Sequence, residues 1–279
     1  MTDTLTNVHL SFIGCGVMAE AMIAGLIRKE LIPPDKIFGS HPRQARRVEL
    51  EKTYGIRMFE SNADAAAVVR DVESSAVILS IKPQRIARVL TDLKDAVAPD
   101  GLVISIVGGA TVETISKELG TDHVVRAMPN TPCQIGAGIT AWTCAQNVSE
   151  NERSQVRSLL SGLGKQLYVE TESMIDMATS LSATGPTYIF MVMEALTDAG
   201  VHLGFSRDVA KELVQETMLG SVKFAMESNK HPAELRNMVT SPGGTSAEAI
   251  YQMEKGTLRT VLSKAVYSAY KRAVELGKK

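Results

Sequence analysis

The chain has 279 residues, 44% hydrophobic and 22% charged, which is the composition of a globular protein and excludes a fibrous or largely disordered one. Thirty Lys and Arg residues against 31 Asp and Glu residues give a formal net charge of −1, so no overall charge attracts nucleic acid or an anionic membrane. Two domains are expected, because single cores stop growing at about 250–300 residues.

The cysteines and the apolar stretches predict a cytoplasmic protein. Cys15, Cys133 and Cys144 are widely spaced and form no Cys-x-x-Cys pair, which indicates a reducing compartment. Residues 1–7 are polar and are not typical of a secretory signal. The longest apolar-rich stretch, 101–112, is shorter than the roughly 20 residues that a membrane span needs, so no membrane partner is expected.

In the first half of the chain, apolar runs alternate with amphipathic stretches, which predicts parallel strands joined by crossover helices. Strands are predicted at 8–13, 36–40, 56–59, 76–81, 102–106 and 124–128, and helices at 18–29, 44–54, 63–70, 85–96 and 112–118. Two further strands, 139–144 and 164–170, flank a helix at 149–163 that Ser149 caps. The fold class is therefore α/β, with an N-terminal Rossmann-type doubly wound sheet over residues 1–170.

From residue 173 onward the hydrophobic period is helical, with breaks at 185–186, 204, 231–232, 242–244 and 256. This pattern predicts an all-helical C-terminal domain over residues 171–279. About a hundred residues of amphipathic helix make a thin core on their own. We therefore expect a dimerisation domain that buries its apolar faces against a second subunit.

Segment 12–19 follows the first predicted strand and opens the first predicted helix. Its Gly-x-Gly-x-x-Ala spacing lets Gly14 make a tight turn, Gly16 approach a pyrophosphate and Ala19 pack closely on the strand. A phosphate would bind at the helix N-terminus, where unpaired N–H groups and the dipole favour an anion. A purely structural turn is the alternative, but the position between strand and helix favours a dinucleotide site.

The end of the second predicted strand bears on the choice of cofactor. An NAD-specific site carries Asp or Glu there to bind the ribose, whereas this sequence offers Ser40, His41 and Arg43, which favours the 2′-phosphate of NADP. Asp35 lies at the opposite end of the strand and is discounted. For Arg46–Arg47 a solvated helix face is the favoured interpretation. We expect NADPH to be preferred.

Other catalytic patterns are absent from the sequence. It has no Gly-x-Ser-x-Gly of a hydrolase, no Ser or Thr after Gly164-Lys165 as in a P-loop, and no histidines spaced as metal ligands, so no metal is expected. Dehydrogenases acting on hydroxyacids need a general acid or base, commonly a lysine, yet none lies between Lys165 and Lys211. The missing base fits reduction of a C=N bond, because an iminium ion is already protonated and electrophilic.

Three further segments, 128–132, 182–188 and 239–246, together with 12–19 and 81–84, resemble those of the pyrroline-5-carboxylate reductases. The resemblance covers essentially the whole chain, and its most specific part is Ser-Pro-Gly-Gly-Thr at 241–245. It implies an enzyme that reduces the cyclic imine 1-pyrroline-5-carboxylate to L-proline, the last step of proline biosynthesis, with NADPH and also with NADH. Such a reaction agrees with the missing base.

The resemblance also implies roles for individual residues. It assigns cofactor binding to Gly14, Gly16, Val17, Met18, Ser40, Asn62, Lys82, Pro83 and Asn130, and the strand-end reasoning adds His41 and Arg43. It assigns substrate binding to Ser182, Ser241, Pro242, Gly243, Gly244, Thr245 and Ser246. For Lys82 a charged strand end is the alternative, and for Asn130 a stiff structural turn.

The Gly-Gly loop is expected to open a helix from about Ser246, whose backbone N–H groups would bind the substrate carboxylate. The Ser246 hydroxyl would then hydrogen-bond the imine nitrogen, which makes Ser246 the candidate catalytic residue. The family usually has Thr here, so the hydroxyl is kept and a methyl group is lost. An ordinary N-cap is the alternative for Ser246.

Family members dimerise by intertwining their C-terminal helices, so the resemblance implies a homodimer whose site combines two subunits. Rings of dimers also occur in the family. Two alternatives stay open at this point. One is a related imine or ketone reductase for another small acid, with the missing lysine against the hydroxyacid version. The other is a non-catalytic NADP-binding sensor, against which the substrate loop argues.

Overall fold

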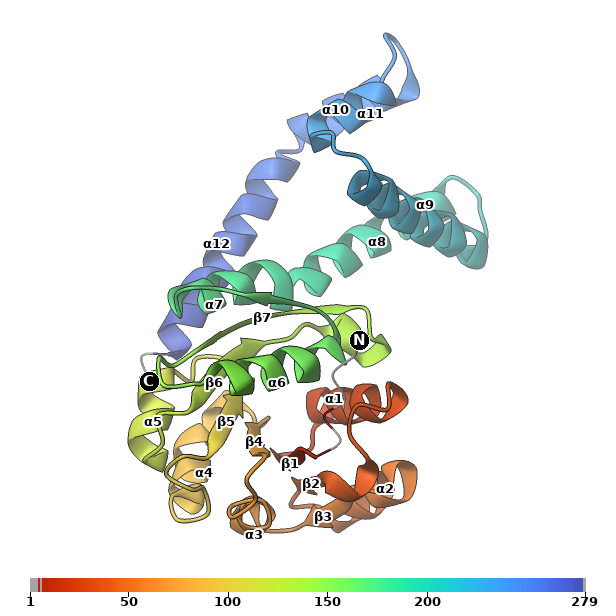
Figure 1. Ribbon diagram of the computed structural model, residues 1–279. Coiled ribbons are helices and arrows are strands. Elements are labelled where there is room, and N and C mark those ends of the chain that lie inside the picture. The colour runs from red at the N-terminus through yellow and green to blue at the C-terminus, as the bar shows by residue number, and fades with distance from the viewer. Residues whose placement is uncertain (1–4, 6, 278–279) are drawn as a thin grey trace. The chain divides into compact units, whose positions relative to one another are not determined.

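The computed structural model of the protein describes residue 5 and residues 7–277 (Figure 1). Most of segment 1–7, in which no secretory signal is expected, lies outside the described residues. The described chain forms two compact units: unit 1 contains the residues up to 184 and those from 269, and unit 2 contains residues 185–268. The domain boundary at residue 170 stays a prediction.

Unit 1 is built on one eight-stranded sheet with the order β3-β2-β1-β4-β5-β6-β7-β8. The strands are β1 His9–Ile13, β2 Ile37–Ser40, β3 Arg57–Phe59, β4 Ser75–Leu79, β5 Leu102–Ser105, β6 Val124–Met128, β7 Gly138–Cys144 and β8 Gly164–Tyr168. All neighbours pair in parallel except β6 and β7. The strand order reverses between β1 and β4, and ligands of such sheets bind at the carboxyl ends of the strands beside that point.

Helices cover both faces of this sheet, as its buried strands require (Figure 1). The helices of unit 1 are α1 Val17–Arg28, α2 Gln44–Tyr54, α3 Asn62–Ala67, α4 Ile86–Leu93, α5 Val112–Leu119, α6 Glu150–Ser161 and α7 Ser173–Ala178. One apolar core, with Met22, Leu50 and Leu160, joins α1, α2 and α6 to the sheet, and a second, with Leu90 and Ile115, joins α3, α4 and α5. The predicted α/β class is confirmed.

The predicted helix ends differ from the observed ones where a local hydrogen bond or a proline determines the helix boundary. The Ser61 hydroxyl accepts from the Asp64 N–H and starts α3 one residue early, and α3 then ends at Ala67 rather than at residue 70. Pro83 opens a 3₁₀ turn, Pro83–Arg85, so α4 spans Ile86–Leu93, whereas a helix from 85 to 96 is predicted. For α6 the predicted cap is confirmed, since Ser149 and Glu152 form a reciprocal capping box.

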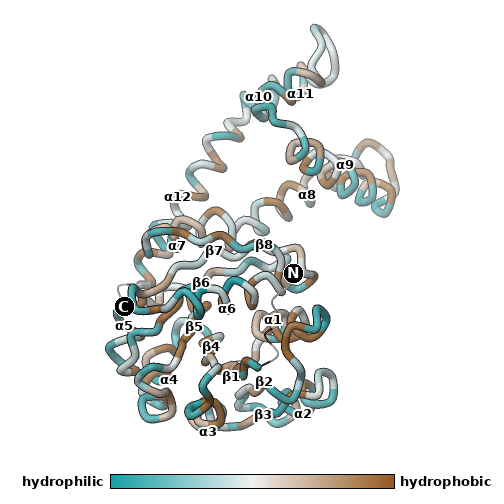
Figure 2. The backbone as a smooth tube through the Cα atoms, in the orientation of Figure 1, coloured by the Kyte–Doolittle hydropathy of each residue, from teal (hydrophilic) through white to brown (hydrophobic). Residues whose placement is uncertain are grey.

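The remaining helices are α8 Gly185–His202, α9 Arg207–Glu227, α10 Pro232–Met238, α11 Thr245–Lys255 and α12 Leu258–Leu276. They begin or end at the predicted glycine and proline breaks. In unit 2 the structure gives Ala210, packed against Gly200, as a buried hydrophobic residue, while long apolar side chains of α8 and α9 such as Met191 and Phe224 are exposed. Figure 2 shows hydrophobic residues along both of these helices. Within the described helices, no segment has both the length and the apolar character to span a bilayer.

Candidate functional site

The turn between β1 and α1 requires glycine at its first position. Gly14 has a φ of +89°, in the left-handed region that side chains rarely adopt. A β-carbon there would lie 2.4 Å from Cγ2 of Ile81, in the loop that follows β4. The turn is therefore wedged between the ends of β1 and β4, at the reversal point of the sheet.

The N-terminus of α1 is open to a ligand. Gly16 is the N-cap residue and no side chain among the described residues caps the helix, so its first N–H groups stay available. A β-carbon on Gly16 would meet no atom within 4 Å, and Val17 is 64% exposed. Met18, the next predicted cofactor residue, is partly buried against the core. This helix end fits the pyrophosphate of a dinucleotide.

Ser40, at the end of β2, holds the glycine turn in place. Its buried hydroxyl accepts a hydrogen bond from the Gly14 N–H at 3.1 Å and donates to Oδ1 of Asn62 at 2.8 Å. The structure thus brings together three residues predicted to serve the cofactor. With its hydroxyl engaged on both sides, Ser40 shapes the glycine turn.

His41 and Arg43, which follow β2, differ in whether their side chains are available to bind a ligand. Nδ1 of His41 accepts from the Arg43 N–H at 3.2 Å, and burial together with nearby arginine charges lowers the pKa of His41 below its usual value. His41 is therefore neutral at pH 7. The Arg43 guanidinium is exposed and has no partner among the described residues, so it is the charge available for a 2′-phosphate.

Arg46 and Arg47 do not form the expected solvated face, because their side chains are only 15% and 16% exposed. Arg46 pairs with Glu20 of α1 and with Glu49, and Arg47 pairs with Glu60 and donates to two carbonyls of the loop after β2. They fix α2 and that loop. Asp35 lies in a 3₁₀ turn before β2, so its exclusion from the cofactor site is supported by its position.

Sequence reasoning missed Ser80, which follows β4. Its N–H donates to the Ile13 carbonyl at 3.0 Å, and its hydroxyl lies 3.1 Å from the carbonyl oxygens of Ile13 and Gly14. The signal was a hydroxyl residue directly after a buried strand. Lys82 caps the turn Pro83–Arg85 through its backbone, and both Lys82 and Pro83 lie at this same edge of the sheet.

Asn130 follows β6 and has a structural role. Its Oδ1 accepts from the Ile139 N–H at 2.9 Å and from the thiol of Cys133 at 3.7 Å, which fixes the start of β7. These contacts fit the stiff turn, and cofactor binding by Asn130 stays a prediction. Burial raises the pKa of the Cys133 thiol, and burial raises the pKa of the Cys15 thiol to about 12, so neither is a nucleophile at neutral pH.

The predicted substrate loop lies in unit 2 and opens α11. Gly244 is the N-cap residue, its N–H donates to the Ser241 carbonyl at 3.0 Å, and no described side chain caps the helix. The helix starts at Thr245, one residue before the expected start. Ser246 is thus the second helical residue, and the interpretation of Ser246 as an N-cap is wrong. Pro242 and Gly243 form the exposed tip.

Ser182 lies in a π-helical turn, Thr179–Ala183, directly before α8. The carbonyl of Thr179 accepts from both the N–H and the hydroxyl of Thr184 at 2.9 Å, which closes the wider turn. Such turns are frequent at functional sites. Ser182 is partly buried and belongs to unit 1, whereas the loop 241–246 belongs to unit 2.

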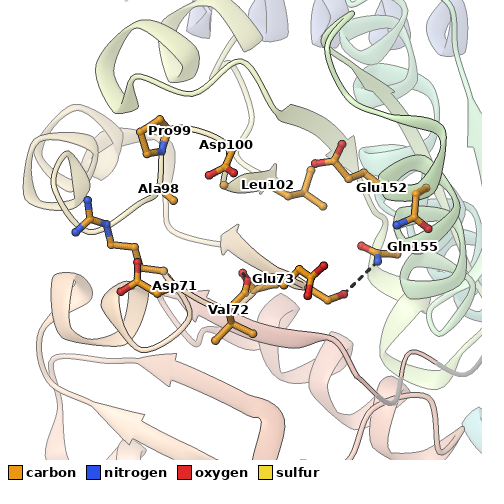
Figure 3. Close-up of a pocket in the computed structure, with 14 residues that line it drawn as sticks. Asp71, Val72, Glu73, Ala98, Pro99, Asp100, Leu102, Glu152 and Gln155 are labelled. Carbon is orange, nitrogen blue, oxygen red and sulfur yellow. Dashed lines mark hydrogen bonds between the residues drawn. The ribbon is translucent and has the colours of Figure 1, made fainter.

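A large cavity of about 710 Å³ lies elsewhere on unit 1 (Figure 3). It opens where β4 and β5 begin, at the edge of the sheet opposite the glycine turn, and contains none of the predicted site residues. Asp71, Glu73, Asp100 and Glu152 give it an acidic lining. Arg70 is the one cation among the described lining residues, so the four carboxylates outnumber it and the lining disfavours phosphates.

Comparisons with known proteins cover the whole chain. Residues 172–276 match the family model for pyrroline-5-carboxylate reductase dimerisation, and residues 9–109 that for NADP oxidoreductase, coenzyme F420-dependent. The chain is 38% identical to the pyrroline-5-carboxylate reductase of Synechocystis sp. over 98% of this chain and 100% of that protein. It is 36% identical to that of Methanosarcina acetivorans over 99% and 100%.

Solved structures agree with these relatives. The crystal structure of Plasmodium falciparum pyrroline carboxylate reductase with NADP bound has a TM-score of 0.88 and 29% identity, covering 97% of this chain and 98% of that one. The pyrroline-5-carboxylate reductase of Coxiella burnetii has a TM-score of 0.85 and 34% identity over the full length of both chains. Both similarities extend across the sheet and the C-terminal helices.

Proposed function

The chain belongs to the pyrroline-5-carboxylate reductase family, and on that premise we propose that it reduces 1-pyrroline-5-carboxylate to L-proline with a hydride from NAD(P)H. The observation that carries the proposal is the loop 241–246, which opens α11 with an uncapped N-terminus. A carboxylate can accept hydrogen bonds from those N–H groups. The glycine turn in unit 1 provides the complementary dinucleotide site.

The residues of unit 1 fit a dinucleotide. The open N-terminus of α1 would hold the pyrophosphate, Gly16 leaves room for it, and Arg43 would pair with the 2′-phosphate. When bound, NADPH supplies the hydride for the imine carbon. The substrate's C=N π bond breaks, its electron pair stays on nitrogen, and that nitrogen keeps the proton it already carried. No side chain needs to transfer a proton in this step.

In unit 2 the substrate carboxylate would bind the N–H groups of Thr245 and Ser246, and the Ser246 hydroxyl would orient the ring nitrogen. Both contacts fix which ring carbon faces the hydride donor. The proposed catalytic contribution of the protein is therefore orientation rather than acid–base chemistry, which accounts for the lysine-free stretch between Lys165 and Lys211.

The proposed assembly is a homodimer formed by the C-terminal helices. The family model matched there describes dimerisation, and the exposed apolar residues of α8 and α9 supply surface for it. A ring of dimers is the higher assembly to look for by light scattering.

The three cysteines are free, which supports the cytoplasmic location we propose.

The activity is tested by the loss of NADPH absorbance when purified protein meets 1-pyrroline-5-carboxylate, with the six-membered cyclic imine as control. Rapid oxidation with the five-membered imine is expected. Inactivity with both imines despite NADPH binding would instead identify a sensor or a reductase of another substrate.

Ser246→Ala is expected to lower kcat/KM for the imine about ten- to a hundredfold, the loss of one hydrogen bond to a charged group. The Kd for NADPH should stay within about twofold, since unit 1 is unaltered. Steady-state kinetics and a fluorescence titration measure the two quantities. Ser246→Thr, which restores the family's usual residue, is the matched control and should keep most activity; unchanged kinetics in the alanine variant would remove Ser246 from the mechanism.

Arg43→Ala is expected to raise the KM for NADPH about tenfold, because an arginine–phosphate pair is lost at an exposed site. The KM for NADH, which lacks the 2′-phosphate, should hardly change. Each cofactor thus controls for the other in the same variant. An equal effect on both cofactors would show that Arg43 does not recognise the phosphate.

A further inference from the structure

The loop between β5 and α5, residues 106–111, lies at the edge of the sheet that carries the glycine turn. Since β1, β4 and β5 pair in parallel, their carboxyl ends meet there. The Ile106 N–H donates to the Leu79 carbonyl at 3.0 Å, which joins this loop to the end of β4. Val107 and Ala110 are buried, whereas Gly108 and Gly109 between them are partly exposed.

The last turn of α12 lies directly on this loop. Gly109 has a φ of +80°, and a β-carbon there would lie 2.7 Å from the carbonyl carbon of Leu276 and 2.9 Å from the Gly277 nitrogen. In the other direction, a β-carbon on Gly277 would lie 3.2 Å from the Gly109 oxygen. Backbone meets backbone here because both residues are glycine. Ala273, one turn earlier, is the buried hydrophobic residue of α12.

The other end of the loop is also held by a distant part of unit 1. The Val112 N–H, at the start of α5, donates to Oε1 of Glu172 at 2.8 Å. The same oxygen accepts from the buried Arg126 at 3.0 Å. The loop is therefore fixed at Val112 by a hydrogen bond to a carboxylate that Arg126 holds in place, and it is supported at Gly109 by the end of α12.

A dinucleotide bound across the reversal point places its adenine half over β1–β2 and its nicotinamide half over β4–β5. The loop 106–111 then borders the nicotinamide. We propose that Gly109 and Gly277 are positioning residues, which let the end of α12 set this loop and thereby the orientation of the nicotinamide ring beside it. This inference rests on the proposed function, and it assigns to α12 a role in turnover beyond dimerisation.

Gly109→Ala tests the contact, and Gly120→Ala is its matched control. Gly120 has a φ of +72°, so alanine suffers the same backbone strain there, but its β-carbon would meet no atom within 4 Å. We expect Gly109→Ala to lower kcat at least tenfold relative to Gly120→Ala, since small misplacements of reacting groups cost large factors in rate. The KM for NADPH should change less than threefold, because the glycine turn and Arg43, not this loop, are proposed to contact the phosphates.

Gly277→Ala alters the same contact from the side of α12. It serves as the test if Gly109→Ala does not fold. A smaller loss of kcat, about threefold, is expected because the new β-carbon would lie 3.2 Å from the nearest backbone atom rather than 2.7 Å. Equal kcat in folded Gly109→Ala and Gly120→Ala, with Gly277→Ala at the wild-type value, would overturn the proposal.

The fluorescence of bound NADPH separates this proposal from the proposed function, because it reports the surroundings of the nicotinamide without turnover. Gly109→Ala and Gly277→Ala should change its intensity, and Gly120→Ala should not. If wild-type protein binds NADPH but reduces no imine, the proposed function fails, while the fluorescence comparison still decides the role of the contact. Identical spectra in all three variants would exclude it.

Discussion

Gly14→Ala is expected to abolish measurable NADPH binding, with a Kd raised at least a hundredfold, and to lower the free energy of unfolding by about 3 kcal/mol. The new β-carbon would meet Ile81 at 2.4 Å in a backbone conformation that alanine resists. The turn must then move, and with it the N–H groups at the start of α1. Fluorescence titration with NADPH and urea unfolding followed by circular dichroism measure the two effects.

Gly16→Ala is the matched control, since it separates binding from stability. Its φ of −81° suits alanine and its β-carbon would meet no protein atom within 4 Å, so the unfolding free energy should change by less than about 1 kcal/mol. The β-carbon would nevertheless occupy the space of the pyrophosphate, and NADPH affinity should fall strongly. Wild-type affinity in this variant would show that the phosphates do not bind at α1.

Arg126→Met is expected to destabilise unit 1 by about 3 kcal/mol. The Arg126 side chain is 2% exposed and bridges Glu172 at 3.0 Å and Asp176 at 2.7 Å, thereby tying β6 to α7 and to the segment before it. Methionine fills much of the volume but leaves both carboxylates without their cation. The loss is smaller than for a fully buried triad, because Glu172 stays one-third exposed.

Urea unfolding of three variants measures this contribution. Arg126→Lys keeps the charge but cannot bridge both carboxylates, so it should lose an intermediate amount of stability. Combining Arg126→Met with Glu172→Gln and Asp176→Asn should recover part of the loss, because no uncompensated charge is left. A single variant Arg126→Met within about 1 kcal/mol of the wild type would contradict the expected role.

The order of strands and helices could be predicted because each is encoded locally. Compact apolar runs marked the strands, and residues such as Gly204 and Pro232 marked where helices end and begin. The exact ends could not be predicted where one side chain decides them, as Ser61 does for α3. Propensity is averaged over a window, whereas a cap is a single hydrogen bond.

The glycine turn of the candidate site could be predicted because its spacing lies within six residues. Ser80, the Arg126 ion pairs and the Gly109–Gly277 approach could not, because each joins positions far apart in the sequence. Periodicity carries no information on such pairs. Arg46 and Arg47 show the same limit. Their acidic partners, Glu20 on α1 and Glu60 after β3, lie outside the helix, so the residue pattern of the helix could not predict these ion pairs.

The return of α12 to unit 1 has a consequence for synthesis on the ribosome. Residues 269–277 belong to unit 1 but are translated only after all of unit 2. Unit 1 therefore stays incomplete while unit 2 is being synthesised. The β-sheet can form before that moment, but the support of Gly109 by Leu276 and Gly277 cannot. A nascent chain stalled within unit 2 would therefore carry the nucleotide-binding sheet with its β5–α5 loop still unsupported.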